Sequence, residues 1–228
     1  MTEQARPRGR EREARVNDHA VLEAARAVFA IRGWDAPMSA IAEHAGVGVA
    51  SIYRRYPSKE ELVLELRLEA LRDVTALATA SLAEPEAATG EEAASGVASP
   101  VARFLRAHVR QAHPPLVNAY GLHPIPSAEV DALAEELYQA LLALIAAEAA
   151  ELPPGFTPAD LMLGITHLRP SLPATPERLT EIHLRHVDLY LLGLRAAARR
   201  PELLSGTGSS WQEWLDLHNS QRPSHARH

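Results

Sequence analysis

Apolar side chains in the first part of the chain recur at intervals of three and four residues, which is the spacing of one face of a helix. The clearest stripe consists of Val21, Leu22, Ala25, Val28 and Phe29. Gly33 follows this stripe, and glycine readily takes the positive φ with which many helices end. The pattern therefore predicts an amphipathic helix that buries one face and ends just before Gly33.

Two shorter helical patterns follow on either side of a glycine turn. Residues 41–45 place apolar side chains on one side of a first short helix, and residues 46–48 form the turn. A second helix is predicted over residues 50–56, with Ile52 pointing inward. Its outward-facing side chains are mostly polar: Ser51, Tyr53, Arg54 and Arg55. This arrangement is typical of a helix-turn-helix, whose second helix enters the major groove of DNA.

A third helix is predicted over residues 58–77, because Pro57 ends the preceding helix and Ser58 with Glu61 forms an S-x-x-E capping box. Lys59, the only lysine of the chain, lies in the first turn of this helix. The helix dipole disfavours a cation there, so contact with an external anion such as a DNA phosphate explains the residue. The alternative is a solvated lysine without a specific role.

The order of these features resembles the DNA-binding domain of the TetR (tetracycline repressor) family of transcriptional regulators. The resemblance covers residues 15–74, with the helix-turn-helix motif at about residues 37–56. It depends on the helix, the glycine turn, the tyrosine and the lysine occurring in register. The resemblance implies an all-α fold, in which this three-helix DNA-binding domain precedes a larger C-terminal helical domain for ligand binding and dimerisation.

The resemblance also implies roles for single side chains. Base edges or the nearby backbone would be contacted by Val49, Ala50, Ser51, Arg54 and Arg55. Phosphate would be bound by Tyr53 and Lys59. Arg54 and Arg55 are the candidates for binding guanine, because a guanidinium group fits the O6 and N7 acceptors. Pro37 stands where the family usually has Ser or Thr, and we expect Ser39 to make that phosphate contact instead.

Composition agrees with a helical fold and limits the chemistry. Alanine and leucine are prominent, aromatic residues make up 5% of the 228 residues, and there is no cysteine for disulfides or thiolate metal sites. No apolar run approaches the roughly 18 residues that span a bilayer, so we expect a soluble, cytoplasmic protein without a membrane segment. We expect no cofactor, no catalytic residue and no metal site, because the 11 histidines form no metal-binding string.

Charge is distributed unevenly along the chain. Residues 1–67 contain 11 basic and 10 acidic side chains, whereas residues 68–228 contain 12 basic and 19 acidic ones. DNA binding would therefore depend on a local cluster of cations rather than on a basic field over the whole protein. Residues 1–14 are predicted to form a flexible Arg-rich arm, which either follows the minor groove or is an ordinary unordered tail.

Helical patterns resume at residues 101–112, 128–150, 158–168 and 176–199, with prolines between them. Residues 75–200 are therefore predicted to form the ligand-binding and dimerisation domain. Candidate ligand contacts combine apolar walls with a few polar groups: Phe104, His108, Tyr120, His123, Tyr138, Met162 and His167. Residues of these types are also usual in an ordinary core. The net acidity of this part slightly favours a cationic or neutral effector.

The last long helix contains a stripe that suits a dimer interface. The stripe consists of Leu179, Ile182, His186, Tyr190, Gly193 and Leu194. In the family that the chain resembles, the last two helices pair with their copies as a four-helix bundle. The alternative is that the stripe belongs only to the intramolecular core. Residues 201–228 are predicted to be a C-terminal tail, either a short docked helix or a mobile segment.

These patterns together predict a ligand-responsive transcriptional repressor. It would bind a palindromic operator in double-stranded DNA as a homodimer and be released by a small-molecule effector that the sequence does not identify. One alternative is an activator or a ligand-independent DNA-binding regulator. A more distant one is a small helical enzyme or metal-binding protein with a fortuitous helix-turn-helix, although no Ser-His-Asp arrangement or phosphate-binding glycine loop is legible.

Overall fold

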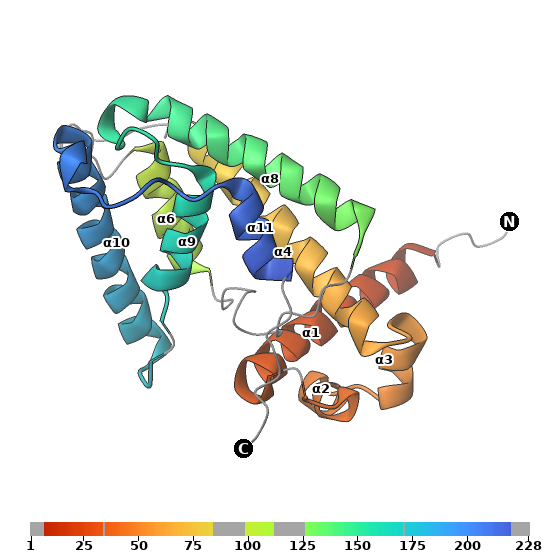
Figure 1. The fold of residues 1–228 in the computed structure, drawn as a ribbon. Coiled ribbons are helices and arrows are strands. Elements are labelled where there is room, and N and C mark those ends of the chain that lie inside the picture. Colours follow the sequence, from red (N-terminus) through yellow and green to blue (C-terminus); the bar gives the residue numbers. More distant parts are fainter. Residues whose placement is uncertain (1–6, 34, 84–98, 112–125, 171, 220–228) are drawn as a thin grey trace, which may run out of the picture.

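The computed structural model describes residues 7–33, 35–83, 99–111, 126–170 and 172–219. Every regular element in these ranges is a helix, and the helices form two groups that share one long helix (Figure 1). The predicted all-α fold is therefore confirmed. None of the described helices combines the length and apolarity that a membrane crossing requires.

The N-terminal group consists of α1 (Pro7–Arg32), α2 (Met38–Ala45), α3 (Val49–Arg55) and the first half of α4 (Lys59–Leu82). These helices enclose a core of their own, separate from the core of the larger group. Its largest fully buried side chains are Phe29, Ile41, Ile52, Leu62 and Leu66. We call this group the DNA-binding unit below, after the role that the sequence predicts for its helix-turn-helix.

Two glycines make the sharp corners of this unit. Gly33 has φ +66° and its N–H donates to the carbonyl of Phe29 at 2.8 Å, so it ends α1 as predicted. Gly46 has φ +67° and ends α2, and the N–H of Val47 then donates to the carbonyl of Ala42 at 3.0 Å. The positive φ of Gly46 allows α3 to follow α2 after a very short turn.

The start of α1 differs from the sequence-based prediction. A flexible arm over residues 1–14 is expected from the sequence, but α1 begins at Pro7, so residues 7–14 are helical. Proline suits the start of a helix, and residues 8–15 are mostly Arg, Glu and Ala, which favour helix formation. Residues 1–6 lie outside the described part of the chain.

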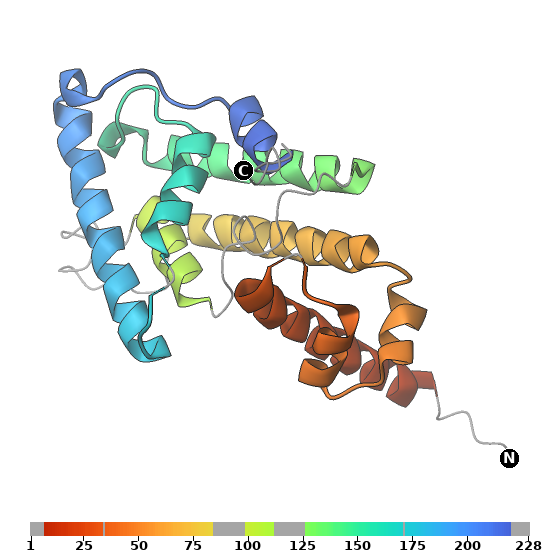
Figure 2. The ribbon, with the colours of Figure 1, turned by 60° about the horizontal axis from the view of Figure 1, so that its bottom comes forward.

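α4 belongs to both groups. Leu62 and Leu66 lie in the core of the DNA-binding unit, whereas Leu68, Leu71 and Ala78 lie in the core of the larger group. Beyond residue 77, where the sequence predicts its end, the helix continues to Leu82. Figures 1 and 2 show it running from the DNA-binding unit along the length of α8 (Ala128–Ala147).

The larger group, which we call the sensor domain below after the role that the sequence predicts for it, adds α6 (Pro100–Arg110), α8, α9 (Pro158–Leu168) and α10 (Pro176–Arg199) to the second half of α4. A hydroxyl group accepts a backbone N–H at the start of each added helix, which satisfies one donor of its first turn. The capping residues are Ser99, Ser127, Thr157 and Thr175. α8 is three residues shorter than predicted, because a separate 3-10 turn, Ala149–Glu151, follows it.

The C-terminal segment is docked on the sensor domain as far as it is described. After a 3-10 turn at Pro201–Leu203, the chain leads to α11 (Trp211–Asn219), and Trp214 is buried in the sensor core. Trp211 stacks on Trp214 with ring centroids 4.3 Å apart and lies 5.3 Å from the ring of Tyr138 on α8. Of the two alternatives for the tail, the docked helix is therefore correct for residues 211–219.

Candidate nucleic-acid interface

α3 is fixed on one side and exposed on the other. Ile52, with 1% of its surface exposed, holds the helix against the core of the DNA-binding unit, and Tyr56 is buried where the helix ends. The remaining side chains of α3 are exposed to solvent: Val49, Ala50, Ser51, Tyr53, Arg54 and Arg55. The structure thus brings six of the eight predicted DNA-contacting residues together on one short helix.

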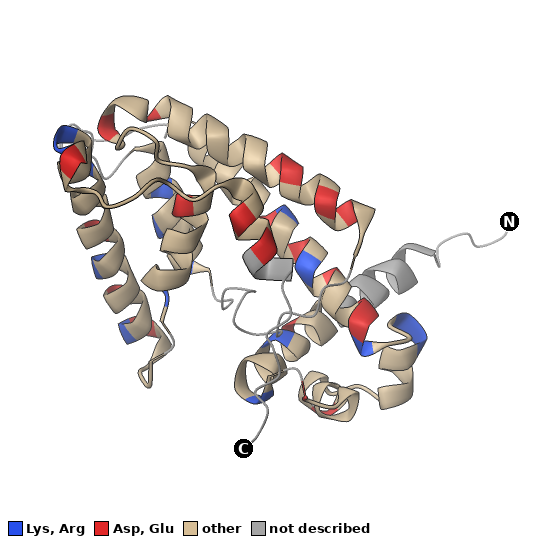
Figure 3. Cartoon of the chain, in the orientation of Figure 1, with Lys and Arg blue, Asp and Glu red and all other residues tan. Residues whose placement is uncertain are grey.

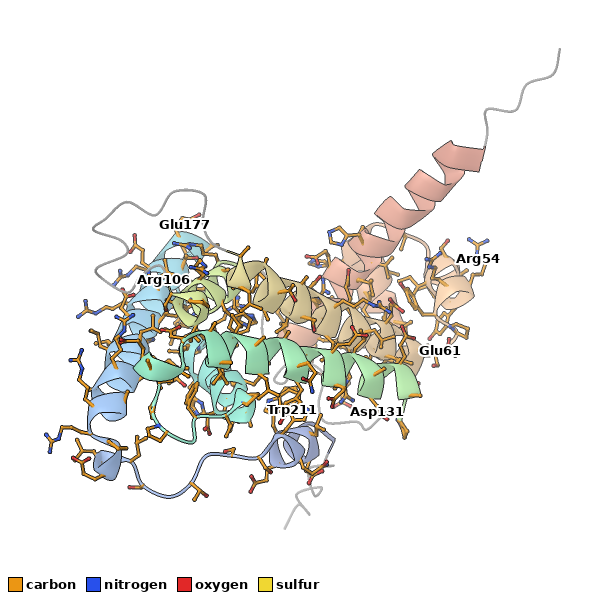
Figure 4. All side chains as sticks on the ribbon, turned by 90° about the horizontal axis from the view of Figure 1, so that it is seen from above. Arg54, Glu61, Arg106, Asp131, Glu177 and Trp211 are labelled. Carbon is orange, nitrogen blue, oxygen red and sulfur yellow. The ribbon has the colours of Figure 1, made fainter. Side chains whose placement is uncertain are left out.

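Arg54 is held in a definite orientation on this exposed side. Its Nη2 donates to Oγ of Ser51, one turn earlier, at 2.9 Å. Figure 4 shows the Arg54 side chain extending from α3 away from the rest of the molecule. This bond involves one of the five guanidinium N–H donors and directs the group along the exposed side of the helix.

Lys59 and Ser39 flank α3 on the neighbouring helices. Ser58 caps α4 by accepting the N–H of Glu61 at 3.1 Å, which confirms the predicted start and puts half-buried Lys59 in the first turn. Ser39 is exposed in the first turn of α2. Pro37 occupies the N-cap position of α2 and makes no side-chain cap, rather than serving as the first helical residue.

The cations around α3 form a small cluster with an acidic border. Figure 3 shows basic residues at the end of α3 and acidic residues at the start of α4. The basic residues are Arg54 and Arg55, and the acidic ones are Glu60 and Glu61. The basic area is small, so a nucleic acid bound there would be held by specific contacts rather than by a broad field.

Comparison with protein families identifies the unit that contains α3. Residues 21–66 match the model of the bacterial regulatory proteins of the tetR family. This part of the chain therefore has the sequence features of a tetR-family regulator. The matched range begins and ends with Val21 and Leu66, which are also the first and last buried residues of the core of the DNA-binding unit.

Solved structures of tetR-family regulators are similar to a large part of the chain. One is a TetR transcriptional regulator from Streptomyces coelicolor, with 25% identity, coverage of 78% of this chain and 98% of that chain, and a TM-score of 0.48. Another is a putative TetR-family transcriptional regulator from Mesorhizobium loti, with 19% identity, coverage of 82% and 98%, and a TM-score of 0.39. Comparison with the curated proteins gives no match.

The predicted ligand contacts lie in several different places. Phe104 and His108 are buried one turn apart on α6, and their ring centroids are 6.2 Å apart. Tyr138 and Met162 are half-buried on α8 and α9, whereas His167 is exposed, with Nδ1 2.8 Å from the carbonyl oxygen of Leu163 on its own helix. Tyr120 and His123 lie outside the described residues.

His108 is the most unusual of these residues. Only 6% of its surface is exposed, and within the described residues neither ring nitrogen has a hydrogen-bond partner. Burial, with a further contribution from the positive charge of Arg169, lowers the pKa of His108 to about 4. The imidazole is therefore neutral at pH 7 and offers one donor and one acceptor nitrogen.

The predicted dimer stripe on α10 is divided between two faces. Leu194 is buried in the sensor core, and Tyr190 packs against α9, where a Cβ at Gly164 would lie 2.8 Å from the tyrosine oxygen. These two residues therefore belong to the core of the chain itself. The members that face solvent fully or in part are Leu179, Ile182, His186 and Gly193.

Sequence reasoning missed three functional candidates. Leu189 and Leu192 are 54% and 62% exposed on α10, beside the exposed members of the stripe. Their three-residue spacing was visible in the sequence, but leucines occur all around this helix and do not mark one face. Arg169, which follows α9 and contacts α6, had no signal at all, because the approach of these two helix ends depends on the tertiary fold.

Proposed function

We propose that the protein is a homodimeric repressor that binds a palindromic operator through α3 and its flanks and releases it when a small molecule binds the sensor domain. The observation on which the proposal chiefly rests is the exposed, cation-bearing face of α3 on a tetR-family unit. Arg54 and Arg55 contact base edges, and Val49, Ala50 and Ser51 contact bases or the nearby backbone. Phosphate is bound by Tyr53, Lys59 and Ser39.

α4 supports the proposed coupling between the two regions. The helix lies in both apolar cores, and ion pairs join it to its neighbours on each side. Glu69 of α4 accepts Nη2 of Arg26 on α1 at 2.6 Å, and Nη2 of Arg72 donates to Glu129 on α8 at 2.5 Å. A displacement of α4 in the sensor domain would therefore move the DNA-binding unit with it.

The coupling that release requires is modest. A ligand shifts a protein between two conformations only by as much as it prefers one of them. Weakening operator binding a hundredfold takes about 2.8 kcal/mol of differential binding free energy. A single well-filled small-molecule site supplies an amount of this size.

Dimerisation is supported by the outer face of α10. Leu189 and Leu192 are exposed apolar side chains next to Gly193, where a Cβ would have no atom within 4 Å. A copy of the helix can approach closely at such a position, and a helix-turn-helix needs two copies to bind half-sites about 34–36 Å apart. Sedimentation at micromolar concentration should give a dimer, and Leu192→Arg a monomer. Leu203→Arg, an equally exposed leucine beyond α10, is the matched control and should remain dimeric.

The DNA-binding role is tested on an operator selected from random duplexes by the purified protein. Lys59→Ala and Tyr53→Phe should weaken binding to all duplexes in gel-shift assays, because phosphate contacts are independent of sequence. Lys59→Ala should also flatten the dependence of log K on log salt. Failure to enrich any duplex, or a Lys59→Ala variant identical to wild type in affinity and salt slope, would contradict these roles. If the protein binds DNA but activates transcription in a reporter assay, the proposed repressor role is wrong and the DNA contacts stand.

A further inference from the structure

Buried polar atoms without partners are concentrated at one place in the sensor domain. Within the described residues, five buried side-chain nitrogen or oxygen atoms have no hydrogen-bond partner, and three of them belong to His108 and Arg169. Both ring nitrogens of His108 and Nε of Arg169 make up this set. In folded proteins nearly all buried polar atoms have a hydrogen-bond partner, so several unpartnered atoms at one place indicate a functional role.

The two residues meet where α6 and α9 end. Arg169 follows the last residue of α9, and its Nη1 and Nη2 donate to the carbonyls of His108 and Gln111 at 3.2 and 2.7 Å. Both carbonyls lie at the C-terminal end of α6, where a helix favours a cation. The guanidinium is therefore held firmly next to the residue whose imidazole is buried.

Capping of α6 explains only part of this arrangement. It accounts for the two Nη contacts of Arg169, but a C-cap does not need a histidine one turn before the helix end. A phenylalanine or leucine at position 108 would fill the same space without burying two polar nitrogens. The histidine is thus unexplained by packing alone.

The local charge is positive and is not neutralised by acidic side chains. In the described part of the chain, no carboxylate forms an ion pair with Arg169, whereas the neighbouring Arg106 on α6 pairs with Asp188 of α10. Burial lowers the pKa of Arg169, and the same burial strengthens its attraction for an anion. The charge at this site is therefore opposite in sign to the net charge of residues 68–228.

Buried apolar residues adjoin the pair along both helices. Phe104 and Leu105 on α6 and Leu168 on α9 are all buried in the sensor core. In both Figures 1 and 2 the C-terminal end of α6 is the end nearer to α1 of the DNA-binding unit. A ligand bound here would have an apolar body, one polar end, and a position close to the part of the protein that it must influence.

We propose that His108 and Arg169 bind the carboxylate of the effector, which is a lipophilic organic acid rather than a cation or a neutral molecule. The neutral imidazole donates one N–H to a carboxylate oxygen, and the guanidinium supplies the counter-charge. This inference rests on the proposed function, because it names the chemical class of the effector. It replaces the expectation of a cationic or neutral effector, which considered only net charge.

The test uses octanoate and benzoate as probes, each against its primary amide, which has nearly the same shape but no charge. Isothermal titration of the full-length protein should show both acids binding at least tenfold more tightly than their amides. His108→Phe should weaken acid binding at least tenfold, whereas His19→Phe, the same change at an exposed position on α1, should have no effect. Arg169→Met tests the role of the guanidinium group. If that variant fails to fold, Arg169→Lys, which keeps the positive charge, should retain part of the preference for the acid.

Equal binding of acids and amides, no binding of either acid at millimolar concentration, or unchanged binding by His108→Phe would overturn the proposal. Operator binding without probe is measured in parallel by fluorescence anisotropy, so the two proposals fail separately. If the protein does not bind an operator, the titration alone still decides whether His108 and Arg169 bind an acid. An acid that binds through His108 without weakening operator binding overturns the effector role of the site.

Discussion

The DNA-binding unit and the sensor domain treat buried basic groups in opposite ways. In the DNA-binding unit, Arg26 is 4% exposed and is paired at 2.6 Å with both Glu23 and Glu69. In the sensor domain, His108 and Arg169 are buried or half-buried without a carboxylate partner among the described residues. Arg26 joins helices through carboxylates of the chain, whereas Arg169 joins them through backbone carbonyls, which leaves its charge available to an anionic ligand.

The two regions also differ in where their candidate binding residues lie. The DNA-binding unit presents its candidate DNA-contacting arginines, Arg54 and Arg55, on the outer face of α3, away from its apolar core. In the sensor domain, the candidate effector contacts lie inside, between α6 and α9. Substitutions of buried groups in either region should therefore change stability, whereas substitutions on the outer face of α3 should change binding with little loss of stability.

The largest effect is expected at Arg26. Arg26→Met should lower the free energy of unfolding by about 3 kcal/mol, because it leaves two carboxylates beside a core without their counter-ion. Urea unfolding at pH 7 measures this change. The matched control is Arg178→Met, whose ion pair with Glu181 is 63% and 67% exposed, and it should change stability by less than about 0.5 kcal/mol. Equal losses in the two variants would refute the structural role of Arg26.

The next effect is a pH dependence due to His108. Its pKa is about 4 in the folded protein and about 6.5 when unfolded, so the unfolded chain binds the proton more readily. The contribution of the neutral His108 to the free energy of unfolding is therefore complete above pH 6.5. As the pH falls towards 4, this contribution is lost, and the free energy of unfolding decreases by an amount on the order of 2–3 kcal/mol. Urea unfolding of wild type and His108→Phe at pH 7 and pH 4.5 measures this loss, as the difference between the two proteins in how much their free energy of unfolding changes with pH. Parallel pH profiles for the two proteins would show that His108 is not buried as a neutral group.

Arg169 should contribute less to stability than Arg26. Arg169→Met removes two hydrogen bonds to carbonyls at the end of α6 and should cost about 1–2 kcal/mol in the free energy of unfolding. Arg110→Met, an exposed arginine in the last turn of the same helix, should cost almost nothing. A loss at Arg169 as large as that at Arg26 would mean that its role is mainly structural.

The smallest effect on stability is expected on the outer face of α3. Arg54→Ala removes an exposed hydrogen bond to Ser51 and should change the melting temperature by no more than about 2 °C. A large drop would mean that Arg54 supports the fold, and its effect on DNA binding would then need another explanation.

The regular parts of the fold were predictable from short-range patterns. The glycines at 33 and 46 and the cap at Ser58 lie where the sequence places them, because turns and caps depend on a few neighbouring residues. α10 begins and ends at the predicted residues, since Thr175 and Pro176 mark its start clearly. The helical residues 7–14 were missed because the arginines there suggested an arm, although their helix propensity is high.

The contacts between helices of the sensor domain were not predictable from such short-range patterns. Periodicity identifies α10 as a helix, but it does not tell which of its leucines face the core. Leu194, which the sequence places in the dimer stripe, is buried, whereas Leu189, outside that stripe, is exposed. The contact of Arg169 with His108 joins residues 61 positions apart, and no local pattern indicates it. His108 was a candidate by its residue type, whereas its unpartnered nitrogens appear only in three dimensions.

The claim that α3 binds a specific DNA sequence through its exposed cations is tested most directly by the affinity of Arg54→Ala for two duplexes. Fluorescence anisotropy would give Kd for the selected operator and for an unrelated duplex of the same length and salt concentration. Loss of a base contact should raise Kd for the operator roughly tenfold or more and leave the unrelated duplex nearly unchanged. Equal Kd values for wild type and variant on the operator would contradict the account.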